Sequence, residues 1–391
     1  MGKEISVAFM CSNIDPSAGG SERVTRYVAG SLKNKGYSCY YIYSNIDDMN
    51  VPNDMKVKVN LNGSANELFA ILIDFIKCHH LDVLIVVNQV YQTPKFQKVY
   101  KKLKEETKIK IVGCLHAAPD NWKKNDKRSL VLPIVYLKSR IKRYLCFLHN
   151  SYSQKSVGMY YLSDKFLLLS DRYIPTFCKT FHVDDSLARK LIAIPNPCPF
   201  TDSYQGEKRD KIVLIVARMD EIQKRIYFAL KVWKKIFEKT KGWSLVIVGD
   251  GRQLKDYKKY TEKNRLTNVR FEGHSSNVAH YYKTSKVFFM TSIWEGQPMS
   301  VIEAMHFGCV PIAVDSFESL HDLVKDGENG VLCKFNDFED VCKKLTYLLS
   351  HEEKIDLYSH RILNTTNEMF VEENIIRKWE NLLTLLTCES K

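Results

Sequence analysis

Short apolar runs rich in valine, isoleucine and leucine alternate with amphipathic stretches along the whole chain. Each run has the length of a β-strand, and the stretches between the runs are long enough for helices. The predicted strands are residues 5–11, 38–43, 83–87, 109–115, 166–169, 191–194, 211–217, 244–248, 269–272, 286–291, 310–314 and 331–333. Such alternation is typical of parallel sheets covered by helices, so the sequence predicts an α/β protein with doubly wound sheets.

Two domains are the simplest division of 391 residues, since an ordinary domain holds roughly 150. Pro195, Pro197 and Pro199 stand at alternate positions between the two sets of strands. Proline cannot continue a helix or a central strand, so we place the junction there, with domains at 1–196 and 197–368. The remaining segment, 369–391, contains a helical pattern whose apolar stripe must dock on a domain.

The cysteines point to a reducing compartment. None of the 11 forms a Cys-x-x-Cys pair, and several lie in apolar runs, as small buried thiols do. The chain starts in a strand-like run without a signal-peptide pattern. No stretch approaches the roughly 18 apolar residues of a membrane span. We therefore expect a cytoplasmic protein.

Positive charge is concentrated between residues 95 and 165, which hold seventeen lysines and arginines and five acids. This excess is nearly the whole formal net charge of +13. It favours an anionic partner, namely a phospholipid surface, a polyphosphate-linked acceptor or a nucleic acid, with a solvated basic face as the alternative. Arg140, Lys142 and Arg143 lie among apolar residues, which suits a membrane interface. We expect peripheral contact with the anionic inner face of a membrane.

Two glutamates bracket the start of a predicted helix in the second half. Pro298 suits the first helical position, because its φ is fixed and it lacks an N–H. The nearby amides are then available to a phosphate at the positive end of the helix; they belong to Gly296, Gln297, Met299 and Ser300. Glu295 and Glu303 can accept hydrogen bonds from a sugar and a ribose on opposite sides of a diphosphate. A capped helix with surface glutamates is the alternative.

Arg218 and Lys224 follow the predicted strand 211–217. A departing nucleoside diphosphate gains negative charge, so two fixed cations stabilise the transition state more than the ground state. They would do the work of a metal, and no Asp-x-Asp pair or histidine cluster in the sequence favours one. We expect no metal and no cofactor besides a substrate nucleotide sugar. Ordinary surface residues are the alternative.

In the first half, Gly19 and Gly20 form a turn that enters a helix after the first strand, where backbone can approach a phosphate. The pattern is not Gly-x-Gly-x-x-Gly and no P-loop lysine follows, which argues against NAD and ATP. His116 follows the predicted strand 109–115. There it is placed to polarise an acceptor or to hold a sugar hydroxyl.

Together these motifs resemble glycosyltransferase family 4, which has the two-domain GT-B architecture. The resemblance covers nearly the whole chain and is most specific in the second half. It rests there on Arg218 and Lys224, the Gly-Asp-Gly turn at 249–251, the Phe-x-Gly step at 271–273, the Glu-x7-Glu motif, and the runs 304–311 and 326–330. The first half matches more loosely, through residues 19–23 and 115–116.

The resemblance implies two Rossmann-like domains facing a central cleft, with the helix of 369–391 crossing back to the acceptor-binding first domain. It implies that Glu295 contacts the donor sugar and Glu303 the ribose. The Arg218 and Lys224 pair would contact the diphosphate. The remaining nucleotide contacts would come from Gly251 and the backbone around Gly273 and His274. Transfer in this family is metal-free, retains configuration and is assisted by the leaving phosphate.

Two segments depart from the usual family pattern. Gly-Gln-Pro-Met follows Glu295 where Ser/Gly-Phe-Gly is commoner, and residues 315–320 replace a turn that usually contains Gly-Pro. This variant resembles transferases of bacterial surface polysaccharide and lipopolysaccharide assembly, which implies a glycan or lipid-linked acceptor. As donor we expect a UDP-hexose or UDP-N-acetylhexosamine, with GDP-mannose second.

Two other functions stay open. One is a noncatalytic module that binds nucleotide sugars or nucleic acid. No RNA- or DNA-reading motif is present, and the donor-site carboxylates would repel a polyanion. The other is an epimerase or phosphorylase on the same fold, which rests on analogy of fold alone.

Overall fold

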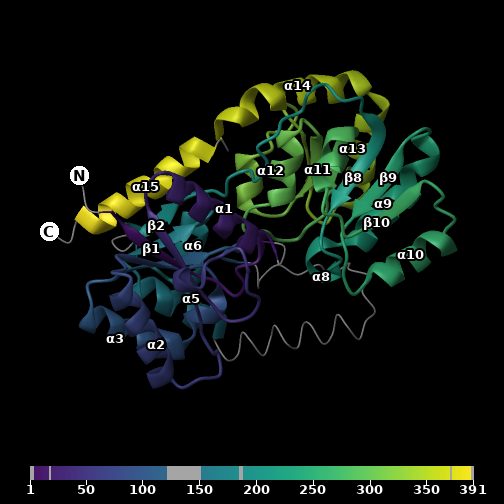
Figure 1. The fold of residues 1–391 in the computed structure, drawn as a ribbon. Helices are drawn as coiled ribbons and strands as arrows, with labels where there is room; N and C mark the ends of the chain where they lie inside the picture. Colours follow the sequence, from purple (N-terminus) through teal and green to yellow (C-terminus); the bar gives the residue numbers. More distant parts are fainter. Residues whose placement is uncertain (1–3, 17–18, 121–150, 185–187, 370–371, 389–391) are drawn as a thin grey trace. The chain divides into compact units, whose positions relative to one another are not determined.

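The computed structural model describes residues 4–16, 19–120, 151–184, 188–369 and 372–388 (Figure 1). The chain forms two compact units. Of the described residues, the first unit contains those up to 119, then 151–199 and 372–388, and the second contains 120 and 200–369. The boundary after Pro199 lies slightly beyond the predicted one, so all three junction prolines belong to the first unit. Among the described helices, none has both the length and the apolar character needed to cross a bilayer.

The first unit is built on a parallel sheet with the strand order β3-β2-β1-β4-β5-β6-β7. Its strands are β1 (Ser6–Met10), β2 (Ser38–Tyr43), β3 (Lys56–Lys58), β4 (Val83–Val86), β5 (Lys110–Leu115), β6 (Lys165–Leu168) and β7 (Leu191–Ala193). Its helices are α1 (Gly20–Asn34), α2 (Ala65–Cys78), α3 (Pro94–Glu106), α5 (Ser151–Leu162), α6 (Tyr173–Phe181) and α15 (Glu372–Cys388). The short edge strand β3 was not predicted, because two of its three residues are lysines.

Helix α15 follows the second unit in sequence but packs within the first. Its buried face consists of the six residues of the predicted apolar stripe, Ile375, Ile376, Trp379, Leu382, Leu383 and Leu386. The indole of Trp379 packs edge-on against Phe9 of β1, with 6.4 Å between ring centroids. At the start of α15, Glu372 accepts hydrogen bonds from Tyr27 (2.8 Å) and Ser31 (2.5 Å) of α1. The helix therefore contributes both apolar and polar contacts to the first unit.

The second unit is built on a parallel sheet with the strand order β10-β9-β8-β11-β12-β13. Its strands are β8 (Asp210–Val216), β9 (Ser244–Val248), β10 (Val269–Gly273), β11 (Ser285–Met290), β12 (Val310–Asp315) and β13 (Val331–Lys334). Its helices are α8 (Glu221–Lys224), α9 (Ile226–Ile236), α10 (Leu254–Lys263), α11 (Val278–Thr284), α12 (Met299–His306), α13 (Phe338–Ser350) and α14 (Glu352–Met369). The predicted strands of both halves are thus present, and each half has its own sheet.

Two glycines let the turn after β9 approach the segment after β8 closely. A Cβ on Gly249 would lie 2.0 Å from the carbonyl oxygen of Ala217, and one on Gly251 would lie 2.7 Å from that of Met219. The backbone nitrogen of Met219 in turn donates to the carbonyl oxygen of Asp250 (2.8 Å). Because φ is +134° at Gly249 and +153° at Gly251, side chains are disfavoured there on conformational grounds as well. This turn supports the backbone on both sides of Arg218.

Candidate active site

The polar residues of the second unit that the sequence singled out meet at one edge of its sheet. Arg218 follows β8, Gly251 follows β9, Gly273 ends β10 and Glu295 follows β11. These four strands are neighbours in the order β10-β9-β8-β11, and all of them are parallel. Their carboxyl ends therefore lie side by side, which is where ligands bind in doubly wound sheets.

Glu295 is held on both carboxylate oxygens. Lys224 Nζ donates to Oε1 at 2.5 Å, and Gln223 Nε2 donates to Oε2 at 3.0 Å. The side chains of Glu295 and Lys224 are only 12% and 18% exposed, so water screens this ion pair less than it would a surface pair. From the sequence we expected Lys224 to contact a diphosphate and Glu295 to contact a sugar. In the structure the two charged groups also contact each other directly.

The loop that follows β11 fixes the position of Lys224. The hydroxyl of Thr291 donates to the Lys224 carbonyl oxygen (2.7 Å), and the backbone nitrogen of Ile293 donates to that of Gln223 (2.8 Å). Asp220 caps the short helix α8 by accepting from the backbone nitrogen of Ile222 (3.1 Å). The bonds from Thr291 and Ile293 hold the end of α8 against the segment that leads from β11 to Glu295.

Arg218 is well exposed, with 70% of its side chain accessible. Its Nη2 atom has long contacts with Asp220 Oδ2 (3.4 Å) and Gln223 Oε1 (3.5 Å). Hydrogen bonds of that length are weak. The guanidinium is thus loosely tethered near Gln223 and Asp220, where its forked donors are accessible to an anionic ligand at the carboxyl ends of the strands.

The helix that carries Glu303 begins one residue later than predicted. Pro298 is the N-cap of α12, with φ −78° and ψ 90°, and Met299 is the first helical residue. The reason is that the Pro298 backbone stays extended while its carbonyl already accepts from the nitrogens of Val301 and Ile302. Gly296 and Gln297 precede the cap in buried positions, whereas Met299 and Ser300 are partly exposed at the helix start.

Glu303 is buried, with 2% of its surface accessible, so it is not a surface charge of an ordinary capped helix. Tyr282 of α11 donates its hydroxyl to Glu303 Oε2 at 2.9 Å. Tyr282 is itself fully buried and stacks on Phe307, with ring centroids 6.3 Å apart. Sequence reasoning missed Tyr282, because one tyrosine in a helical pattern gives no sign of its partner across the fold.

The proposed base contacts lie at the edge strand β10. Gly273 has a φ of +72°, a conformation that favours glycine, and its carbonyl oxygen accepts from the nitrogen of Gly249 (2.7 Å). His274 follows and is exposed. Gly251 lies on the turn after β9, the strand that pairs with β10. The two backbone segments predicted to line the nucleotide are therefore neighbours in the sheet.

Three predicted residues, Gly19, Gly20 and His116, belong to the first unit. The carboxylate of Glu22 covers the glycine turn at the start of α1. A Cβ on Gly19 would lie 2.7 Å from Glu22 Oε2. That oxygen accepts from the Ser21 hydroxyl (2.7 Å), and Glu22 is buried, with 8% of its surface accessible. A negative charge disfavours a phosphate at this place, in contrast to the expectation from the glycine turn.

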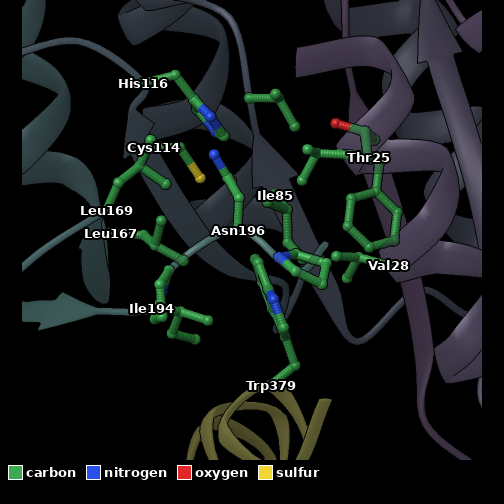
Figure 2. Close-up of a pocket in the computed structure, with 15 residues that line it drawn as sticks. Thr25, Val28, Ile85, Cys114, His116, Leu167, Leu169, Ile194, Asn196 and Trp379 are labelled. Carbon is green, nitrogen blue, oxygen red and sulfur yellow. The ribbon is translucent and has the colours of Figure 1, made fainter. Parts of the chain in front are cut away.

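His116 lines a pocket of the first unit, together with Asn196 and aliphatic side chains, and Trp379 lies at its far end (Figure 2). Burial lowers the pKa of His116 to about 4, against a smaller opposite effect of the Glu22 charge. The imidazole is therefore neutral near pH 7. A neutral imidazole can both donate and accept a hydrogen bond, which fits a contact with a hydroxyl.

In the described part of the chain, no three histidine, cysteine or acidic side chains are grouped so that they could hold a metal. The positive charge at the strand ends comes instead from Arg218 and Lys224. Sequence analysis thus predicted the charged residues, while the residues that hold them, Gln223, Thr291 and Tyr282, became visible only in the fold.

The second unit matches a known family. Residues 201–363, which include all of these strand-end residues, match the model of the family described as Glycosyl transferases group 1. The protein is a glycosyltransferase. An uncharacterized glycosyltransferase of Haemophilus influenzae is 26% identical over 96% of this chain and 99% of its own. The amylovoran biosynthesis glycosyltransferase AmsD of Erwinia amylovora is 24% identical over 94% and 96%.

The fold of this glycosyltransferase agrees with solved structures over its whole length. The apo form of the lipopolysaccharide outer core galactosyltransferase WaaB gives a TM-score of 0.69 at 18% identity, covering 96% of this chain and 98% of that one. Such a likeness concerns the fold, and it identifies the two parallel-sheet units as those of a GT-B transferase. The family model does not cover the sheet of the first unit, but the structural match to WaaB does.

Proposed function

We propose that this glycosyltransferase moves a hexose or an N-acetylhexosamine from a nucleotide sugar to a glycan or lipid-linked saccharide in cell-surface polysaccharide or lipopolysaccharide assembly. The observation that carries the proposal is the Glu295 cluster, in which a largely buried carboxylate, two cations and an amide share one edge of the sheet. The names of AmsD and WaaB support an acceptor of this kind. UDP-sugars are our first choice of donor and GDP-mannose the second, following the resemblance of the sequence.

The chemistry follows from the charges. A leaving nucleoside diphosphate would meet Arg218 and Lys224, whose positive charge counters the negative charge that develops as the glycosidic bond breaks. Glu295 would accept a hydrogen bond from a donor-sugar hydroxyl, and Glu303 from the ribose. In this proposal transfer retains configuration and needs no metal, and the leaving phosphate takes the proton of the attacking hydroxyl.

We further propose that basic residues of 95–165 hold the enzyme at the anionic inner face of a membrane. Lys98 and Lys101 are exposed on α3, which supports the idea, whereas Lys102 is paired with Glu106 (3.7 Å) and Lys104 with Asp164 (3.0 Å). Arg140, Lys142 and Arg143, which the sequence singled out, lie outside the described residues. An exposed row of lysines near an anionic surface is attracted to it within a Debye length.

Release of UDP or GDP from a panel of sugar nucleotides tests the enzyme proposal. We expect one donor class to be hydrolysed slowly without acceptor and consumed faster with lipid-linked or polysaccharide acceptors, and the same class to raise the thermal midpoint. If no donor is turned over and none shifts the midpoint, the proposed transfer is wrong. Product anomers read by NMR would distinguish retention from inversion.

A further inference from the structure

Gln223 joins the two charged side chains that flank it. Its Nε2 atom donates to Glu295 Oε2 and to the Trp294 carbonyl oxygen, each at 3.0 Å. Its Oε1 atom faces Arg218 Nη2 at 3.5 Å. One side-chain amide therefore contacts the carboxylate on one side and the guanidinium on the other. No charge of its own is involved, so it links the two groups without repelling either.

The place of Gln223 is set by backbone and not by the charges it touches. Its carbonyl oxygen accepts from the nitrogen of Ile293, and the neighbouring Lys224 carbonyl accepts from Thr291. Both of these donors belong to the segment that leads from β11 to Glu295. The amide group and the carboxylate are thus mounted on two backbone segments that are bonded to each other.

The two groups on Glu295 differ in what they can fix. Lys224 donates from an ammonium with three rotatable hydrogens on a flexible stem, so it can follow the carboxylate through a range of rotations. The amide N–H of Gln223 is directional, because its strength falls as the donor angle departs from linear. Its second contact, with the Trp294 carbonyl, fixes the amide plane further. The carboxylate orientation therefore depends on Gln223 more than on Lys224.

We propose that Gln223 is a positioning residue for sugar transfer, which orients the Glu295 carboxylate toward the donor sugar. The inference rests on the proposed role of Glu295 at the sugar. Gln223 acts through Glu295 and does not itself contact the nucleotide. Loss of its amide would therefore impair transfer of the sugar while leaving the affinity for free UDP, which carries no sugar, unchanged.

The test uses Gln223→Met, which keeps the length of the side chain and removes the amide. We expect kcat to fall by about tenfold or more, the usual scale for a lost hydrogen bond to a charged group. Isothermal titration should give an unchanged Kd for UDP. Gln205→Met is the matched control, because Gln205 is exposed and its side chain bonds to Ser203 of its own loop (2.7 Å). It should transfer at the wild-type rate.

A double-mutant comparison separates positioning from a general effect on the fold. If Gln223 acts through Glu295, adding Gln223→Met to Glu295→Ala should cause no further loss of transfer. If the double variant lost transfer by the product of the two single losses, the inference would be contradicted. A loss of UDP affinity in Gln223→Met as large as its loss of transfer would contradict it too. Wild-type transfer rates in Gln223→Met would overturn it while leaving the proposed function intact.

Two further outcomes have defined meanings. Failure of the wild-type enzyme to transfer from any donor would remove the proposed function and this inference together. If Gln223→Met lowers the thermal midpoint, Gln223→Glu gives a second test, because glutamate has the same size and shape as glutamine. A carboxylate there would repel Glu295, so we expect transfer to fall further than in Gln223→Met, and equal or higher transfer would count against positioning.

Discussion

Glu295 and Lys224 form an ion pair in which each charge is countered by the other. Lys224 donates to one carboxylate oxygen of Glu295, and Gln223 donates to the other. Glu303 differs, because it is deeply buried and held by Tyr282. The two glutamates of one sequence motif therefore have unlike surroundings.

This difference predicts that substitutions of the two glutamates impair different steps. Glu295→Ala should lose transfer and keep most of its UDP affinity, because a sugar contact is removed. Glu303→Ala should lose UDP affinity by about tenfold or more, because a charged hydrogen bond to the ribose is lost. Titration with UDP and an assay of transfer measure the two effects. Equal loss of UDP binding in both variants would contradict the division of roles, and Tyr282→Phe should give a smaller loss of affinity than Glu303→Ala.

His116 predicts a dependence of stability on pH. Its folded-state pKa of about 4 lies below the ordinary 6.5, so the unfolded chain takes up a proton first on acidification. His116 therefore stabilises the fold fully above pH 6.5 and loses that contribution as the pH falls from 6.5 to 4. Thermal midpoints of the wild type should fall more steeply over this range than those of His116→Gln. Parallel curves would show that the imidazole keeps its ordinary pKa.

At the scale of elements, α15 is the best example of a helix defined by its pattern. All six residues of its apolar stripe are buried. The stripe does not say which unit it packs on; the family resemblance implied the first unit, and the helix does pack there. The short helix α8 is the opposite case. Arg225, which follows it, has a φ of +55° and is almost fully buried, and no sequence pattern announces such a residue. Tertiary packing selects that conformation.

The packing of α15 predicts a large effect for Trp379→Ala. The indole is 8% exposed, so truncation should lower the free energy of unfolding by about 3–5 kcal/mol. Leu385→Ala on the same helix is the control, because Leu385 is 43% exposed and should change it by less than about 0.5 kcal/mol. Urea unfolding followed by circular dichroism measures both. Similar losses in the two variants would mean that α15 is not docked through this face.

The exposed lysines of α3 predict contact with an anionic membrane surface. Lys98→Glu with Lys101→Glu reverses two exposed charges and should weaken sedimentation with phosphatidylglycerol vesicles by about tenfold or more. Lys258→Glu with Lys259→Glu makes the same change on α10, which is exposed in the other unit, and should leave binding unaltered. Equal binding of the wild type to neutral and anionic vesicles would refute the membrane proposal.

At the scale of the whole molecule, each unit presents functional residues at the carboxyl ends of its own parallel strands. The second unit supplies the cations and carboxylates, and the first supplies a neutral histidine beside the buried Glu22. The charged residues at the strand ends of the second unit fit the proposed transfer of a sugar from a diphosphate to a hydroxyl.

The charge inventory predicts that activity survives removal of metals. Arg218 and Lys224 provide the positive charge that a divalent ion would supply, so dialysis against EDTA should leave kcat within about twofold. Arg218→Ala should lower kcat by roughly a hundredfold. Arg270→Ala is its control, since Arg270 is also well exposed, at 58%, and lies on β10. Full dependence on added Mn²⁺ or Mg²⁺ would overturn the metal-free scheme.

Most of the architecture could be predicted from local pattern. Buried parallel strands are continuous apolar runs, so their places along the chain are visible in the sequence. The edge strand β3 was missed because its lysines lack that pattern, and α14 was not singled out. At the site, Glu295, Arg218 and Lys224 stood out as motif residues, but Gln223 could not, since its role depends on two hydrogen bonds to residues distant in sequence.

By itself the sequence determined which residues carry charge at the strand ends, because strand, turn and helix signals are local. Tertiary structure decided what those charges touch. It paired Lys224 with Glu295, buried Glu303 against Tyr282 and placed Glu22 over the glycine turn. The physical reason is that periodicity and turn chemistry act over a few residues. Hydrogen bonds and burial, in contrast, join segments that only the folded sheet brings to one edge.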